Sequence, residues 1–277
     1  MSTINSGPRA PWQTHFGFTR APFGKSLAPS ELFTRTPHEE AVARIRHCIA
    51  EAALGVITGE VGTGKTVAAR AARASLDPSR HALIYIANPA FGTRGLYVSV
   101  VRALGGSPRF FKAEVMAQAQ ELLEAEEAER HRRVVIVVDE AHLLSPEQLE
   151  EIRLLTSAEM DSRTPFALLL VGQPTLVRRL RMGVFAALDQ RIATRYQLRP
   201  MDLAESAGYL RHHLALAGRT DPLFADDAVA RLHRASLGLP RALNNLARDA
   251  LIAAAADGKA LVDDACAKKA VAEAVSE

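Results

Sequence analysis

An eight-residue stretch in the first quarter of the chain has the residue types needed to hold phosphate groups. Residues 59–66 fit the pattern G-x-x-x-x-G-K-[ST]. Glycines let backbone N–H groups turn inward around phosphate oxygens, and the helix that follows adds its positive end. We expect Lys65 to reach the β- and γ-phosphates of a nucleotide and the Thr66 hydroxyl to ligate Mg²⁺. The candidate nucleotide-binding residues are Gly59, Glu60, Val61, Gly62, Thr63, Gly64, Lys65 and Thr66.

Two acids follow the most aliphatic run of the chain. Residues 134–138 are all Val or Ile, and Asp139 and Glu140 come directly after them. Ligands bind at the carboxyl ends of strands in open α/β sheets. We therefore expect Asp139 to hold Mg²⁺ from a strand that neighbours the one before the phosphate loop. Glu140 would polarise the attacking water as a general base. We interpret the nearby His142 as a surface or supporting histidine.

The elements that must position these groups alternate between strands and helices. After a helix that starts near Thr36, apolar runs predict strands at 55–58, 82–87, 134–138, 166–171 and 193–198, the last at a sheet edge. Helical periodicity predicts helices at 65–76, 96–104, 113–129, 146–159, 176–181 and 186–191. This alternation is typical of a mostly parallel sheet covered by helices on both faces.

Segments of a different character flank this α/β region. Residues 1–37 are rich in Pro, Gly, Ser and Thr, and their isolated aromatic side chains favour packing onto the rest of the protein. After residue 200 the patterns predict helices alone, at 203–217, 225–236, 241–256 and 263–275. We therefore predict an arm (1–37), an α/β domain (38–200) and a helical lid domain (201–277).

The composition excludes several classes of protein. Of 277 residues, 48% are hydrophobic and 23% charged, which argues against a disordered chain. The two cysteines, Cys48 and Cys266, lie too far apart for a zinc or disulfide framework. A net charge of +3 permits a nucleic-acid partner without demanding one. No apolar run is long enough to span a membrane and no secretory signal is recognisable, so we expect a cytoplasmic protein.

These motifs together resemble the AAA+ ATPases, and within them the ExeA/TniB/TnsC/MuB group of secretion-type ATPases and transposase helpers. The resemblance rests on GEVGTGKT, on VVDEAHLL, and on the arm residues 16–18, 22–23, 32–33 and 38–41. It also rests on the motifs at 170–174 (LVGQP), 188–192 (LDQRI) and 238–241 (GLPR). It implies a P-loop AAA+ three-layer α/β sandwich with a five-stranded sheet, a small all-α lid, and ATP with Mg²⁺ as ligands.

The resemblance also assigns roles to polar residues outside the phosphate loop. Gln173 matches a polar sensor that helps to orient the water. Arg191 resembles an arginine finger that acts on the nucleotide of a neighbouring subunit, with Arg195 as the rival, and a surface salt bridge is the alternative for either. Arg241 resembles a second sensor of the γ-phosphate, the alternative being a helix-start arginine that faces solvent.

The arm resembles a segment that covers the adenine base. Phe23 and His38 are its candidate contacts, and an equally good interpretation is that each simply caps the core. Because an arginine finger in trans requires an assembly, the resemblance implies ATP-driven self-association. The pattern fits both closed rings and helical filaments.

The leading functional interpretation is an ATP-dependent regulator of DNA transposition. It would oligomerise on double-stranded target DNA, recruit or activate a separate transposase, and disassemble on hydrolysis. Arg94, Arg109 and Lys112 are the candidate DNA contacts. The alternatives are a solvated loop for Arg94 and a core-anchoring role for the pair Phe110 and Phe111.

Two other functions compete with transposition. An ExeA-like ATPase that assists assembly of a secretion or envelope machine is the runner-up. Those relatives extend through a membrane helix into a wall-binding domain, so from the length of this chain we expect no membrane partner. A replication initiator or clamp loader is the third interpretation, and it would need a further domain for which the sequence has no room.

Overall fold

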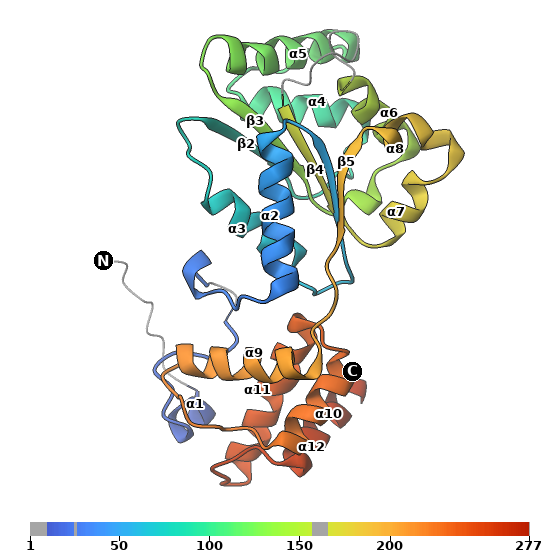
Figure 1. Cartoon of the computed structure of the whole chain (residues 1–277). Coiled ribbons are helices and arrows are strands. Elements are labelled where there is room, and N and C mark those ends of the chain that lie inside the picture. The colour runs from blue at the N-terminus through green and yellow to red at the C-terminus, as the bar shows by residue number, and fades with distance from the viewer. Residues whose placement is uncertain (1–9, 25–26, 157–165, 277) are drawn as a thin grey trace. The chain divides into compact units, whose positions relative to one another are not determined.

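The computed structural model describes residues 10–24, 27–156 and 166–276, and divides into two compact units (Figure 1). The α/β unit is Thr36–Arg199, and the helical unit combines Met1–Arg35 with Pro200–Glu277. The arm, predicted as a separate segment, therefore groups with the C-terminal helices. No helix in the described part of the chain is long and apolar enough to cross a lipid bilayer.

The α/β unit is built on five parallel strands in the order β2-β3-β4-β1-β5. This confirms the predicted five-stranded parallel sheet and the edge position of its last strand. The strands are β1 (Leu54–Thr58), β2 (His81–Ile86), β3 (Arg133–Val138), β4 (Phe166–Gly172) and β5 (Ile192–Gln197).

The strand order corrects one expectation about the acids. Asp139 follows β3, which does not neighbour β1, because β4 lies between them and pairs with both. Hydrophobic patterns reveal strands but not their order, which the crossover connections decide. The register places Thr58 beside Gly172, and Val138 beside Leu170. The carboxyl ends of β1, β4 and β3 therefore still meet at one edge of the sheet.

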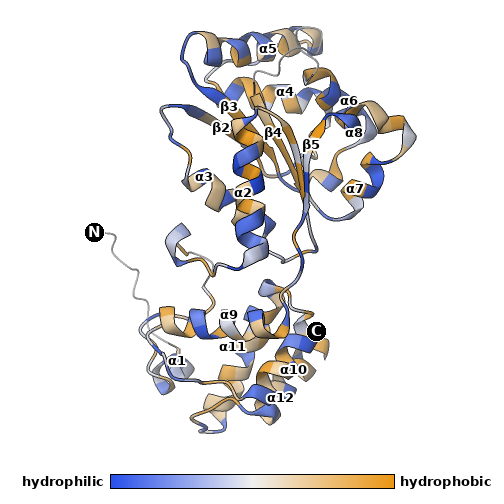
Figure 2. Cartoon of the chain, in the orientation of Figure 1, coloured by the Kyte–Doolittle hydropathy of each residue, from blue (hydrophilic) through white to orange (hydrophobic). Residues whose placement is uncertain are grey.

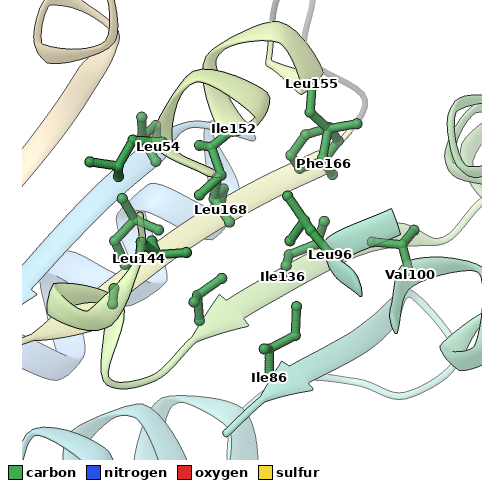
Figure 3. Close-up of a cluster of buried hydrophobic side chains, with 14 of the residues drawn as sticks. Leu54, Ile86, Leu96, Val100, Ile136, Leu144, Ile152, Leu155, Phe166 and Leu168 are labelled. Carbon is green, nitrogen blue, oxygen red and sulfur yellow. The ribbon is translucent and has the colours of Figure 1, made fainter. Parts of the chain in front are cut away.

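Helices cover both faces of this sheet, giving three layers. Helices α2 (Thr36–Ala50) and α3 (Lys65–Ala74) pack on one face, against Val135 and Val137 of β3. Val134, Ile136 and Val138 of the same strand belong to the core on the opposite face. Figure 3 shows Ile136 there among other buried apolar side chains. Because both faces are covered, β4 and residues 134–138 of β3 are continuously apolar instead of alternating (Figure 2). The second helical layer contains α4 (Gly92–Ala103), α5 (Lys112–Ala128), α6 (Pro146–Leu155), α7 (Thr175–Leu180) and α8 (Ala186–Gln190).

Short 3₁₀ turns complete this layer and the arm. They are η1 (Pro29–Glu31), η2 (Ala141–Leu143) and η4 (Gly183–Phe185). The helix predicted at 146–159 ends at Leu155, and residues 157–159 of that prediction lie outside the described residues. The turn η2 matters most here, because it directly follows the two acids at the end of β3.

The helical unit has a core of its own, to which the arm contributes. Its helices are α1 (Pro11–His15), α9 (Leu203–Leu216), α10 (Asp226–Ser236), α11 (Pro240–Ala256) and α12 (Asp264–Ser276). Phe16, Phe18 and Phe23 of the arm are buried among the apolar side chains of these helices. Burying an aromatic side chain contributes about 1.5–3 kcal/mol, so the arm is an integral part of this unit.

A buried histidine gives the helical unit a defined sensitivity to acid. His213 of α9 is 3% exposed and stacks on Phe23 with ring centroids 5.4 Å apart. Burial, together with the charges of His212 and Arg20, lowers the pKa of His213 from 6.5 to about 4. The unfolded chain therefore binds a proton at a higher pH than the folded chain does. Stability is lost as the pH falls from about 6.5 to about 4.

Over that pH interval, we expect protonation of this histidine in the unfolded chain to lower the free energy of unfolding by up to about 3 kcal/mol. Chemical unfolding of the parent and of His213→Leu between about pH 7 and about pH 4.5 measures the effect. The variant should lose much of the pH dependence of its unfolding free energy, whereas the exposed-site control His47→Ala should keep it. If the unfolding free energy depended on pH equally steeply in the parent and in His213→Leu, the prediction would be wrong.

Candidate nucleotide-binding and hydrolysis site

The loop between β1 and α3 has the backbone that its glycines predict. Gly62 and Gly64 have φ values of +86° and +97°, which side-chain-bearing residues rarely adopt. Gly64 caps α3, so the helix begins at Lys65. The Lys65 side chain is buried, and its Nζ donates to the carbonyls of Gly59 and Glu60 at 2.9 Å each. The loop thus curls around its own lysine at the positive end of a helix.

Asp139 accepts hydrogen bonds from two other segments of the α/β unit and from the residue that follows it. The Thr66 hydroxyl donates to its Oδ2 at 2.9 Å, and the Tyr85 hydroxyl donates to the same oxygen at 2.7 Å. The backbone N–H of Glu140 donates to Oδ1 at 2.9 Å. Partial burial, together with the hydrogen bond that the Tyr85 hydroxyl donates to Asp139, raises the pKa of Tyr85. Sequence reasoning missed Tyr85, because nothing in the local pattern of β2 indicates that it faces the end of β3.

Thr66 and Asp139 fit a magnesium ion. One supplies a hydroxyl and the other a carboxylate, and their oxygens lie 2.9 Å apart. Mg²⁺ prefers such hard oxygen ligands together with phosphate oxygens. The ion would supply positive charge that neutralises the phosphates of a bound nucleotide.

The chain turns sharply after Asp139 and brings a second acid toward β4. Glu140 has φ +51°, a left-handed conformation that costs a residue with a side chain about 1–3 kcal/mol. Its Oε2 lies 3.4 Å from Nδ1 of His142. Nε2 of the same ring lies 2.9 Å from Nε2 of Gln173, just beyond β4. The structure therefore bonds Gln173 to His142 and places Glu140 close to the other ring nitrogen, an arrangement that the sequence did not indicate.

The arginines of the α/β unit have distinct partners. Arg191 is half-buried at the end of α8, where it donates to the carbonyl of Thr156 at 3.4 Å. Arg195 of β5 pairs with Asp189 at 2.8 Å. Arg179 of α7 donates to the carbonyls of His142 and Leu144 in the turn after the acids.

The other three candidate residues belong to α2 and to the helical unit. Arg241 is an exposed residue in the first turn of α11 and belongs to the helical unit. Phe23 is part of the core of that unit, which supports its interpretation as a capping residue. His38 is buried in the first turn of α2. Roles for these residues at a nucleotide remain predictions.

The candidate DNA contacts gather where α4 meets the start of α5. Arg94 donates to the carbonyls of Phe110 and Arg109, at 3.0 and 2.8 Å. Lys112 pairs with Glu151. The core-anchoring interpretation of Phe110 and Phe111 is wrong, because their side chains are 80% and 64% exposed. The hydrogen bonds from Arg94 thus fix the backbone of the loop, while its two phenyl rings are exposed to solvent.

Arg109 differs from the other two cations of this group. It is exposed, and within the described residues its side chain forms no hydrogen bond or ion pair. Its backbone N–H is fixed by the side chain of Gln118 at 3.1 Å. Of the three candidate cations, Arg109 is therefore the one whose charged group is available to a ligand.

The comparisons with known proteins agree with the site. Residues 48–180 match the family model of the AAA domain. The solved structures of Cdc6p from Pyrobaculum aerophilum and of Drosophila ORC bound to DNA have TM-scores of 0.67 and 0.71, each at 18% identity. They cover 87% and 100% of this chain, and the match spans 67% and 70% of theirs. At this identity the likeness shows the fold alone. The chain therefore carries an AAA-family ATPase domain in the P-loop AAA+ fold.

A relative of known sequence adds a more specific similarity. General secretion pathway protein A of Aeromonas hydrophila is 34% identical over 252 residues, which cover 88% of this chain. The match spans 45% of that protein, so the chain corresponds to less than half of its length.

Proposed function

We propose that this ATPase domain binds ATP with Mg²⁺ and hydrolyses it at the edge where β1, β3 and β4 end. One observation carries the proposal: the Thr66 hydroxyl of the phosphate loop meets the Asp139 carboxylate at 2.9 Å. A second contact agrees with it, since Gln173 bonds to His142 and Glu140 lies 3.4 Å from the same ring. Lys65 would bind the β- and γ-phosphates, while Thr66 and Asp139 hold the metal. Glu140 would take the proton of the attacking water and Gln173 would orient that water.

We further propose that ATP drives self-association of the chain. Arg191 or Arg195 would reach the nucleotide of a neighbouring copy and stabilise charge on the transferred phosphoryl group. Arg241 would report the γ-phosphate from the helical unit. Such a head-to-tail arrangement closes into a ring or continues as a filament according to its rotation.

Double-stranded DNA is the partner that we propose for this assembly. The exposed Arg109 and the loop that Arg94 holds support it, because a few cations repeated along an oligomer suffice for phosphate binding. The use of ATP favours a cytoplasmic location. A separate transposase as the recruited partner follows from the resemblance of the motifs alone.

A second candidate function has an observation of its own. The 34% identity to a general secretion pathway protein favours an ATPase that assists a secretion or envelope machine. The same nucleotide chemistry would then act on a protein partner at the membrane. Binding to DNA distinguishes the two candidates, because only the first requires it.

We expect the chain to bind duplex DNA in the presence of a slowly hydrolysed ATP analogue and to form rings or filaments visible by electron microscopy. Arg109→Ala should weaken this binding on all sequences and reduce the slope of log affinity against log salt by about one per site. The control Arg73→Ala removes an exposed cation from the end of α3 and should leave both quantities unchanged. Absence of DNA binding in every nucleotide state would contradict the first candidate and favour the second.

A further inference from the structure

His142 stands between two residues of the proposed hydrolysis site. Its Nε2 lies 2.9 Å from Nε2 of Gln173, and its Nδ1 lies 3.4 Å from Oε2 of Glu140. An amide nitrogen can only donate, so Nε2 of the neutral ring accepts and Nδ1 carries the ring proton. Nδ1 therefore carries a buried proton that forms no hydrogen bond with any described residue, and the Glu140 carboxylate lies 3.4 Å away from it.

The backbone around His142 is held from two sides. The guanidinium of Arg179 donates to the carbonyls of His142 and Leu144, at 2.8 and 2.7 Å. On the side of β4, a Cβ on Gly172 would lie 3.0 Å from the backbone nitrogen of His142. With its backbone packed this closely and its side chain 13% exposed, the imidazole has little freedom to leave its place between the two strand ends.

The side chain of Glu140 is held by fewer contacts than that of His142. Its side chain is 50% exposed, and among the described residues no other side chain forms a hydrogen bond or ion pair with its carboxylate. A general base must hold its oxygen at hydrogen-bond distance from the proton that it removes. A displacement of about 1 Å can cost about 100-fold in rate. The position of the histidine therefore matters to the chemistry of the acid.

We propose that His142 is a positioning residue that couples Gln173 to Glu140. The Gln173 amide fixes which ring nitrogen carries the proton, and that proton orients the carboxylate toward the water. The inference depends on the proposed role of Glu140 as the base. It assigns to His142 an effect on the rate of hydrolysis and not on the affinity for nucleotide, since the polar neighbours of the ring among the described residues are Gln173 and Glu140 and not the proposed phosphate- or metal-binding residues.

The test compares variants of the whole chain for steady-state ATP hydrolysis and equilibrium nucleotide binding. His142→Ala should lower kcat by about 10- to 100-fold and leave the KM and the dissociation constant for ATP within about threefold. His142→Asn keeps an amide donor near the position of Nδ1 and should recover part of the lost kcat. The control His47→Ala removes an exposed histidine of α2 and should match the parent.

A second comparison separates positioning from a general structural defect. In the Glu140→Gln background, His142→Ala should change the residual single-turnover rate by less than about twofold, because no base remains to be positioned. A parent-like kcat for His142→Ala would overturn the inference, as would a loss of ATP affinity that accounts for the whole effect. If Glu140→Gln itself hydrolyses ATP at the parent rate, the base assignment fails, which is a distinct and recognisable outcome.

Discussion

Replacing Glu140 with Gln should lower kcat for ATP by about 100- to 10,000-fold and leave the affinity for ATP within about threefold. The carboxamide keeps the size and polarity of the side chain but has no lone pair basic enough to take the proton of water. The phosphate loop and the pair formed by Thr66 and Asp139 are untouched, so the nucleotide should still bind. Single-turnover hydrolysis and equilibrium binding of a fluorescent ATP analogue measure the two quantities separately.

The expected separation of binding from turnover makes this variant informative. Glu51→Gln is a suitable control, since it makes the same chemical change at an exposed site at the end of α2. It should hydrolyse ATP like the parent. A variant at Glu140 that retains the parent rate would assign the proton transfer to another group. The trapped ATP state should also stabilise any assembly that forms only with ATP.

Replacing Lys65 with Ala should produce the opposite pattern, in which binding itself is lost. The ammonium is buried in the loop, where it donates to two carbonyls, and we expect it to move its donors onto the β- and γ-phosphates. Charge-assisted hydrogen bonds of this kind contribute about 1.5–3 kcal/mol each. The dissociation constant for ATP should therefore rise by about 10- to 1,000-fold, as measured by calorimetry.

Two companion variants test whether charge or shape matters at this position. Lys65→Arg keeps the charge but replaces a compact ammonium with a planar guanidinium, which the curled loop should accommodate poorly. It should bind ATP more weakly than the parent. Lys268→Ala removes an exposed lysine of α12 and should have no effect. An unchanged ATP affinity in Lys65→Ala would contradict the assignment of residues 59–66 as the phosphate site.

Much of the fold could be predicted from the sequence because its signals are local. An aliphatic run such as 134–138 forms a buried strand wherever that strand lies in the sheet. A glycine-rich loop before Lys65 implies a turn and the start of a helix. The order of the strands is different in kind, because it depends on which segments pack together after they have formed. The insertion of β4 between β1 and β3 was therefore missed.

The exposure of single side chains also depended on the fold. Phe110 and Phe111 form an apolar pair, and such pairs are usually buried, yet the loop that carries them turns outward. The phenylalanines of the arm look similar in the sequence, but Phe16 and Phe18 lie in the core of the helical unit. Hydrophobicity alone does not distinguish these cases, because the partners that bury a side chain come from distant parts of the chain.

By itself the sequence predicted the candidate residues for phosphate, metal and water, because that chemistry requires fixed residue types at short, fixed spacings. Lys65, Thr66 and Asp139 were predicted in this way as ligands, and Glu140 as the base. Only the tertiary structure decided what surrounds them. Tyr85 reaches Asp139 from another strand, and His142 meets Gln173 across 31 positions of the chain. Such contacts leave no local signal, since they arise only when the strand ends are brought to one edge of the sheet.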